Sequence, residues 1–208
     1  MIINEVIDED TQQIIDENNG LEELNNCTVL ITGASGMIGS YFVYTLMKLN
    51  EDYGRNITII PVVRHLNKLS SQVLEKTYVY PIVQDVCTPL TYEGSVDYVI
   101  HAASPASPKI MKEHPVETNF ANTIGTANTL MFSLNKKVKG YLYISSREIY
   151  GQPMPGQEVF TEDGPLGQVD PLVPRNGYAE GKKAAENMCS GFKEEHGLNT
   201  KIVRLAHT

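Results

Sequence analysis

The stretch Thr28-Val29-Leu30-Ile31-Thr32-Gly33-Ala34-Ser35-Gly36-Met37-Ile38-Gly39 decides the fold of this chain. Its first five residues form a short apolar run, which predicts a buried strand. From Met37 to Leu49 the apolar residues recur at helical spacing, which predicts a helix directly after the glycines. A turn this tight needs residues that tolerate positive φ, and glycine does so because it has no side chain. The stretch therefore predicts a strand, a tight turn and a helix in immediate succession.

The predicted turn has the properties of a binding site for a diphosphate. A missing side chain lets the backbone approach a ligand closely, and a helix N-terminus offers free N–H groups and partial positive charge. The glycines follow the pattern Gly33-x-x-Gly36-x-x-Gly39 between a strand and a helix, which is the context that such a site requires. We expect the diphosphate bridge of a dinucleotide to contact Gly33, Ser35, Gly36, Met37, Ile38 and Gly39.

Strands and helices alternate along the rest of the chain. Further strands are predicted at Asn56–Val63, Tyr78–Val83, Val96–His101, Lys139–Ser145 and Lys201–Leu205. Helices are predicted at Val116–Leu134 and Tyr178–His196, and a long Pro- and Gly-rich loop at Gln152–Asn176. This alternation predicts an α/β fold, a Rossmann-type doubly wound parallel sheet with helices on both faces. We expect residues 1–26 to form an acidic helical extension and residues 27–208 to form the NAD(P)-binding domain.

Composition limits the partners that this chain is expected to have. The 208 residues carry a formal net charge of -8, which disfavours binding to nucleic acid or to an anionic membrane. No apolar run approaches the roughly 18 residues that a membrane span needs. The three cysteines lie far apart, which argues against a zinc site and against disulfides. We expect a soluble, cytoplasmic protein without a metal ion.

The end of the second predicted strand bears on the choice of dinucleotide. Enzymes that bind NAD usually place an Asp or Glu there, to bond the ribose 2′-hydroxyl. The stretch Ile60–His65 has no acid but contains Arg64, which meets the 2′-phosphate of NADP in one interpretation and only stacks on adenine or contacts solvent in the other. Asp85 and Val86 follow the third strand, where a carboxylate accepts from the adenine amino group. We expect NAD, with NADP as the alternative because of Arg64.

A tyrosine and a lysine at the start of the last predicted helix are candidates for catalysis. Tyr178 and Lys182 are four residues apart, so they lie on one helix face, one turn from each other. A nearby ammonium favours the phenolate and lowers the pKa of a phenol, so we expect Tyr178 to act as a general base. Ser145 and Ser146 follow the fifth strand, at the sheet edge where ligands bind in such folds. The Ser146 hydroxyl is expected to bond the substrate oxygen that Tyr178 deprotonates.

These motifs together resemble the NAD-dependent epimerase/dehydratase family of extended short-chain dehydrogenases/reductases. The resemblance runs from about residue 28 to residue 208, with five motifs in the family's order. They are Ile31–Gly39, His101–Pro108, Asn122–Asn128, Ser145–Gly151 and Tyr178–Lys182. Members of this family modify nucleotide sugars, so the resemblance implies a nucleotide-sugar substrate.

The resemblance also implies roles for single residues. Ala102, Ala103 and Ser104 would line the cofactor, Ser104 would also meet the substrate, and Ser145 would lie beside the cofactor. Asn122 would hold the architecture of the site and contact the cofactor. Lys182 would bond the nicotinamide ribose. Tyr178, which would also contact the cofactor, would take the proton from the sugar O4 while hydride leaves C4.

Within the family the chain looks most like the UDP-glucuronate decarboxylases, also called UDP-xylose synthases. Glu148 matches a catalytic glutamate of decarboxylases and 4,6-dehydratases, and Arg175 precedes Tyr178 as it does in decarboxylases. Dehydratases carry Asp where this chain has Arg147, which weakens the dehydratase interpretation. Arg147 and Arg175 are therefore candidates for binding a substrate carboxylate or phosphate. A 4-epimerase, a 4,6-dehydratase and a 4-keto reductase remain alternatives, so the expected class is lyase or isomerase.

Members of the family continue beyond the length of this chain. We therefore expect the C-terminal sugar-binding part to be mostly absent from residues 1–208. One alternative follows from this length, a truncated and non-catalytic protein that binds a dinucleotide. The family dimerises through helices that match Val116–Leu134 and Tyr178–His196, so a homodimer with a four-helix interface is expected.

Overall fold

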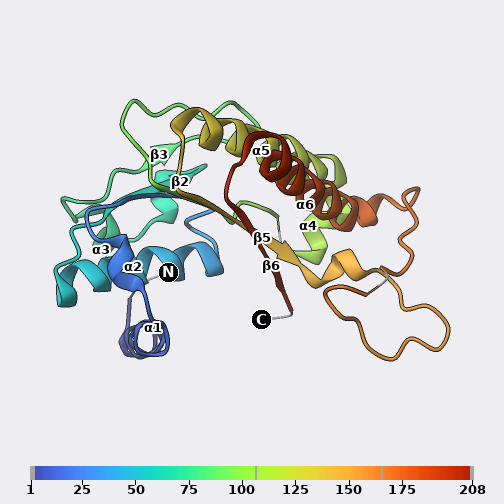
Figure 1. Cartoon of the computed structure of the whole chain (residues 1–208), viewed down its shortest axis with the longest axis horizontal. Helices are drawn as coiled ribbons and strands as arrows, with labels where there is room; N and C mark the ends of the chain where they lie inside the picture. The colour runs from blue at the N-terminus through green and yellow to red at the C-terminus, as the bar shows by residue number, and fades with distance from the viewer. Residues whose placement is uncertain (1–2, 106, 165, 207–208) are drawn as a thin grey trace.

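A six-stranded parallel sheet forms the centre of the computed structural model, which describes residues 3–105, 107–164 and 166–206. The strands follow the order β3-β2-β1-β4-β5-β6 (Figure 1). Their bounds are β1 (Thr28–Thr32), β2 (Thr58–Val63), β3 (Ile82–Val83), β4 (Tyr98–His101), β5 (Gly140–Ser146) and β6 (Thr200–Leu205). Ala106 of the His101–Pro108 motif and residues 207–208 lie outside the described residues. The doubly wound α/β fold predicted from the sequence is confirmed.

Helices lie on both faces of the sheet. Figure 1 shows α5 and α6 together on one face, and α1, α2 and α3 on the other. The α-helices are α1 (Glu5–Glu17), α2 (Met37–Tyr53), α3 (Ser71–Leu74), α4 (Pro108–Glu113), α5 (Pro115–Lys136) and α6 (Gly177–His196). The described residues also form the short 3₁₀ helices η1 (Leu21–Leu24), η2 (Leu66–Lys68), η3 (Arg147–Tyr150) and η4 (Pro174–Asn176).

Each face of the sheet has its own hydrophobic core, because successive side chains of a strand point to opposite faces. Ile31 of β1 packs in the cluster under α2, and its neighbour Leu30 packs in the cluster under α5 and α6. Both side chains are fully buried. A strand buried on both faces reads as a continuous apolar run, which is why the sequence of β1 does not alternate.

The centre of the sheet positions the functional site. β1 pairs with β2 on one side and with β4 on the other, and Thr32 lies in register with Val62 and with His101. The chain order reverses between β1 and β4, and ligands bind in the crevice at the carboxyl ends of such strands. The residues that follow β1, β2 and β4 therefore meet at one edge of the sheet.

The third strand is shorter than the sequence predicts. A strand was expected over Tyr78–Val83, but the ladder of β3 contains only Ile82 and Val83, with an isolated bridge between Val79 and Ile59. Pro81 lies between the bridge and the ladder, and a proline has no N–H to donate. The short helix α4 was not predicted at all.

The N-terminal segment packs against the domain through polar and apolar contacts. Asn4 caps α1 by accepting from the Ile7 N–H at 3.1 Å. The Lys48 ammonium of α2 donates to Asp8 at 2.7 Å, and the Tyr41 hydroxyl donates to Asp10 at 2.5 Å. The segment thus lies against the outer side of α2. None of the helices in the described part of the chain is long and apolar enough to cross a membrane.

A substitution at Gly39 tests how tightly the turn is packed. A Cβ built there lies 2.2 Å from the Gly33 carbonyl oxygen, a backbone atom that cannot shift at low cost as the end of a flexible side chain could. We expect Gly39→Ala to lower the free energy of unfolding by about 2–3 kcal/mol, measured by urea denaturation. Gly191→Ala is the matched control, because Gly191 lies in α6 with nothing within 4 Å of its added Cβ. The control should gain up to about 1 kcal/mol. Equal stability of the two variants would contradict the packing described here.

Candidate active site

The shape of the turn after β1 is fixed by backbone contacts. Gly33 has a φ of +66°, and a Cβ there would lie 2.7 Å from the backbone of Ala102 and Ala103. The Gly36 N–H donates to the Gly33 carbonyl at 2.9 Å, which closes the turn. No side chain caps α2, which begins at Met37. Within the described residues its first N–H groups therefore have no capping side chain, and N–H groups in this position can hold an anion.

A cavity of about 540 Å³ opens beside this turn. It extends across the carboxyl ends of β1, β2 and β4, the position that the topology predicts for a ligand. Nine residues proposed from the sequence for the cofactor line its wall. They are Gly33, Ser35, Gly36, Arg64, Asp85, Val86, Ala102, Ala103 and Ser104.

The wall formed after β2 and β3 carries one cation and one carboxylate. Arg64 and Asp85 both line the cavity, and no ion pair joins them or links Arg64 to another described acid. The Asp85 carboxylate accepts from the Cys87 N–H at 2.8 Å. The Val86 carbonyl accepts from the Asn128 side chain at 2.9 Å, which ties this wall to α5.

Tyr178 and Lys182 lie together at the start of α6. The Tyr178 side chain is 8% exposed and Lys182 is 3% exposed. The Lys182 ammonium lies 5.7 Å from the centre of the Tyr178 ring and donates to the Ile144 carbonyl of β5 at 2.7 Å. The hydroxyls of Ser146 and Ser104 lie close enough to the Tyr178 phenol to act on its pKa, and Ser104 lines the cavity. Ser104 thus connects the tyrosine to the cavity beside the glycine-rich turn.

The pKa of Tyr178 does not behave as the sequence suggests. We expected Lys182 to lower it, but burial raises the pKa of Tyr178 above its ordinary value of 10. The Glu148 carboxylate raises the pKa further, while the neighbouring hydroxyls of Ser146 and Ser104 lower it. The ammonium of Lys182 is itself affected, since burial lowers the pKa of Lys182 to about 7. The expectation was wrong for the chain alone because it ignored the burial of both groups.

A network of charged side chains that the sequence analysis missed lies behind Lys182. Glu186 is one helical turn beyond Lys182 and opposes the effect of burial on its pKa. Arg204 of β6 donates to the Glu186 carboxylate at 2.8 Å, and the Ser145 hydroxyl donates to it at 2.5 Å. Arg204 also donates to the Tyr150 hydroxyl at 3.3 Å. The four-residue spacing from Lys182 was the available signal for Glu186.

Glu148 and Arg175, 27 residues apart in the sequence, form a bidentate ion pair. One of the two hydrogen bonds measures 2.8 Å, between the Arg175 Nη2 and a Glu148 oxygen. The pair lies beside the phenol, since both charges act on the pKa of Tyr178. Arg147, next in the chain to Glu148, is exposed and forms no ion pair with a described residue.

Some residues proposed from the sequence do not reach the cavity wall. The Ser145 hydroxyl is bonded to Glu186, so its side chain points to the buried network instead of the cofactor cavity. Asn122 is buried in α5, where its amide nitrogen donates to the Thr118 carbonyl at 2.9 Å and its oxygen has no partner among the described residues. Met37 and Gly39 are not among the residues that line the cavity.

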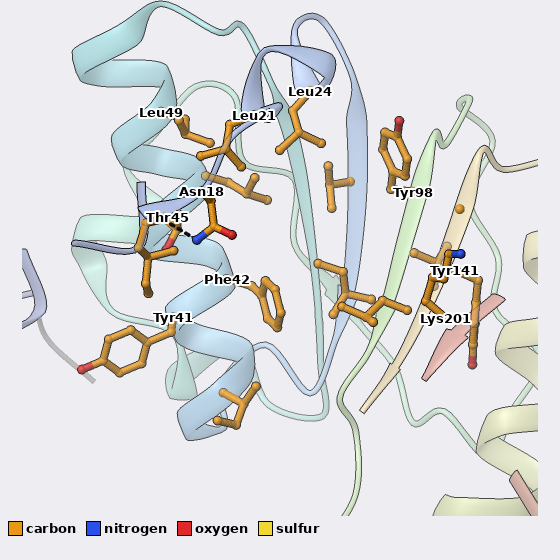
Figure 2. Close-up of a pocket in the computed structure, with 18 of the residues that line it drawn as sticks. Asn18, Leu21, Leu24, Tyr41, Phe42, Thr45, Leu49, Tyr98, Tyr141 and Lys201 are labelled. Carbon is orange, nitrogen blue, oxygen red and sulfur yellow. Dashed lines mark hydrogen bonds between the residues drawn. The ribbon is translucent and has the colours of Figure 1, made fainter. Parts of the chain in front are cut away.

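A second, larger cavity of about 710 Å³ lies on the α2 face of the sheet (Figure 2). Figure 2 shows Phe42 of α2 and Tyr98 of β4 around the same hollow. Ile38 lines this cavity, so its side chain points away from the cofactor cavity. The described lining contains no carboxylate, imidazole or thiol, and we therefore assign the chemistry to the cavity beside the glycine-rich turn.

The doubly wound sheet, the glycine-rich turn and the Tyr178–Lys182 pair define a dinucleotide-binding domain of the short-chain dehydrogenase/reductase type. The comparison with protein families agrees with this class and narrows it. Residues 29–208 match the NAD dependent epimerase/dehydratase family, and the chain belongs to that family.

Curated relatives of this chain include UDP-glucuronic acid decarboxylases. The chain is 34% identical to UDP-glucuronic acid decarboxylase 1 of Danio rerio, over 90% of this chain and 43% of the relative. It is 36% identical to UDP-glucuronic acid decarboxylase 6 of Arabidopsis thaliana, over 88% of this chain and 51% of the relative. The chain therefore spans about half the length of the curated relatives that it matches.

Solved structures share the fold. The dTDP-glucose 4,6-dehydratase DesIV of Streptomyces venezuelae, solved with NAD bound, matches with a TM-score of 0.71 at 23% identity, over 85% of this chain and 55% of that one. UDP-glucuronic acid 4-epimerase of Bacillus cereus, also in complex with NAD, matches with a TM-score of 0.66 at 19% identity, over 86% of this chain and 56% of that one.

The buried Lys182 predicts a pH dependence of stability. The pKa of Lys182 is about 7 in the folded chain, and its ordinary value of 10.5 applies in the unfolded chain. Between pH 7 and pH 10.5 the unfolded chain therefore binds more protons than the folded chain. The free energy of unfolding should therefore rise with pH from 7 toward 10, by up to about 1.4 kcal/mol per unit. Urea denaturation at pH 7, 8 and 9 measures this slope. In Lys182→Met the free energy of unfolding should rise less steeply with pH, because the contribution of Lys182 is lost. Equal slopes for wild type and variant would contradict the prediction.

Proposed function

We propose that this chain is the dinucleotide-binding half of an enzyme that modifies nucleotide sugars at C4. The observation that carries the proposal is the link through Ser104, which joins the Tyr178 phenol to the cavity beside the glycine-rich turn. A base and a dinucleotide cavity are thus adjacent, as a reaction that removes a proton from a hydroxyl group and a hydride from the carbon that bears it requires. The names of the relatives supply the substrate class, a nucleotide sugar.

A nicotinamide dinucleotide fits the cavity as the structure describes it. The N–H groups at the uncapped start of α2 would hold the diphosphate, and Ala102, Ala103 and Ser104 would lie along the nicotinamide half. Lys182 would bond the nicotinamide ribose, and Asp85 would accept from the adenine amino group. When bound, the nicotinamide supplies an acceptor and donor of hydride. NAD is the dinucleotide of the solved neighbours.

The residues of this chain would handle the proton. Tyr178 would take the proton of the sugar O4, and Ser146 would bond the same oxygen. The hydroxyls of Ser146 and Ser104 beside the phenol favour the phenolate and so oppose the effect of burial on the pKa of Tyr178. Lys182, buried against the ring of Tyr178, adds to this whenever it carries its proton.

Decarboxylation is the reaction that we favour within the proposal. Oxidation at C4 of a uronic acid makes a β-keto acid, which loses carbon dioxide before the hydride returns. Both curated relatives named above are UDP-glucuronic acid decarboxylases. Glu148 would act beside Tyr178, held in place by Arg175, and the unpaired Arg147 is available for the substrate carboxylate. Epimerisation, dehydration and 4-keto reduction are the alternatives, together with dinucleotide binding without turnover.

Two further proposals concern the setting of the protein. The three free cysteines, two of them buried, suit a reducing compartment such as the cytoplasm. Residues 1–26, with α1 packed on α2, would be a stabilising extension of the dinucleotide-binding domain at 27–208.

The assignment of Tyr178 is tested by removing its hydroxyl. We expect Tyr178→Phe to lower conversion of UDP-glucuronate to UDP-xylose by about 10²- to 10⁴-fold, the range of general acid–base catalysis, in the whole polypeptide that carries this chain. Binding of the reduced dinucleotide, followed by fluorescence, should stay within about twofold of wild type. Turnover that survives the change would remove Tyr178 from the mechanism.

Product analysis separates the candidate reactions. NMR of the wild-type reaction with UDP-glucuronate and dinucleotide should show UDP-xylose and carbon dioxide for a decarboxylase. UDP-galacturonate would indicate an epimerase instead. Dinucleotide binding without any product, from this and other nucleotide sugars, would favour the non-catalytic alternative.

A homodimer is proposed through α5 and α6. Exposed apolar side chains recur along α5 at intervals of four and seven residues, which places them on one helix face. They are Val116, Phe120, Ile124 and Met131. A contiguous apolar stripe on a helix usually marks a contact with another protein, and the family resemblance assigns these helices to a two-fold interface.

The dimer proposal predicts the effect of charges on this stripe. The double variant Ile124→Glu and Met131→Glu should convert a dimer into a monomer, because two desolvated carboxylates per chain disfavour the interface. Size-exclusion chromatography with light scattering measures the mass. Leu172→Glu, an exposed apolar residue of the long loop, is the matched control and should remain dimeric. A monomeric wild type would contradict the proposal.

A further inference from the structure

We infer that the adenosine end of the cavity is a site for a ribose 2′-phosphate, so that this chain binds NADP(H) in preference to NAD(H). The inference rests on the proposed function, since it assumes that a nicotinamide dinucleotide occupies the cavity. It differs from what the names of the solved neighbours suggest, because those structures hold NAD.

The position of Arg64 is the first support. β2 ends at Val63, and Val62 lies in register with Thr32, the last residue of β1. Arg64 therefore lies beside the turn that begins at Gly33, and it lines the same cavity as Ser35. In doubly wound folds the residue after the second strand is next to the ribose hydroxyls of the adenosine.

The charges around Arg64 are the second support. The sequence has no Asp or Glu between Asp52 and Glu75, so no carboxylate follows β2 to bond a free 2′-hydroxyl or to repel a phosphate. The Arg64 guanidinium is exposed and has no ion pair with a described residue. Asp85, a carboxylate that lines the same cavity, already accepts from the Cys87 N–H. Five N–H donors are thus available to a planar set of phosphate oxygens.

The carboxylates of the cavity wall make this local cation necessary. NADP carries an additional phosphate with a charge between −1.5 and −2 at pH 7, and Asp85 and Glu117 both line the cavity. Without a local cation the phosphate would therefore weaken binding. If the Arg64 guanidinium only contacts solvent, NADPH should bind no more tightly than NADH. If it contacts the 2′-phosphate, NADPH should bind more tightly, so the two affinities distinguish the interpretations.

Fluorescence titration of the whole chain with NADPH and NADH tests the inference without requiring turnover. We expect NADPH to bind at least tenfold more tightly, which corresponds to about 1.4 kcal/mol. Displacement by 2′,5′-ADP and by ADP isolates the phosphate, and 2′,5′-ADP should be the stronger competitor by a similar factor. The preference should shrink below about pH 6, where the phosphate gains a proton.

Variants at Arg64 identify the group responsible. Arg64→Ala should remove the preference by weakening NADPH while NADH changes less than threefold, and Arg64→Asp should reverse it. Lys68→Ala is the matched control, because Lys68 is an exposed cation four residues away that does not line the cavity. It should retain the wild-type preference, and thermal melting verifies that each variant is folded.

The titrations distinguish failure of the 2′-phosphate site from failure of the dinucleotide site. Tighter binding of NADH, or a preference for NADPH that Arg64→Ala leaves intact, overturns the 2′-phosphate site and leaves the proposed function standing. Absence of binding by either dinucleotide to the folded wild-type chain overturns the dinucleotide site itself, and the inference with it.

Discussion

The contact between two backbones at the glycine-rich turn is the constraint on which the rest of the structure depends. Gly33 approaches the backbone after β4 so closely that a single methyl group would collide with it, and Gly39 approaches Gly33 more closely still. These contacts bring the start of α2 to the carboxyl edge of the sheet. They also leave the first N–H groups of α2 without a capping side chain. One steric requirement thus creates both the crevice and the donors that an anionic ligand needs.

A second constraint is the burial of Lys182 against β5. A buried ammonium is unfavourable unless polar groups surround it, and the Ile144 carbonyl and the Glu186 carboxylate supply them. Glu186 is in turn neutralised by Arg204 of β6 and bonded by Ser145 of β5. The network therefore joins α6 to the last two strands and fixes the face of α6 that carries Tyr178. Residues remote from the cavity determine where the phenol points.

Local patterns in the sequence predicted most of the fold and only part of the site. β1, the turn and α2 could be predicted from the run Thr28–Thr32 and the glycines after it, because residues adjacent in the sequence determine these elements. The shortening of β3 depends on Pro81, which interrupts the ladder. The pairing of Glu148 with Arg175 and the orientation of Ser145 depend on contacts between distant segments, which periodicity does not encode. The raised pKa of Tyr178 follows from burial, a property of the assembled core.

Local geometry outweighs net charge in this chain. Screening at physiological ionic strength limits the reach of exposed charges to about 8 Å, so a ligand at the crevice responds mainly to the groups that line it. There the uncapped start of α2 and the Arg64 guanidinium both attract an anion, while most of the acidic residues lie elsewhere, six of them among residues 5–17. An acidic protein can therefore hold a polyanionic dinucleotide without any basic surface. In the function proposed above, a few donors around one turn would set the affinity for the cofactor, separately from the groups that would select the sugar.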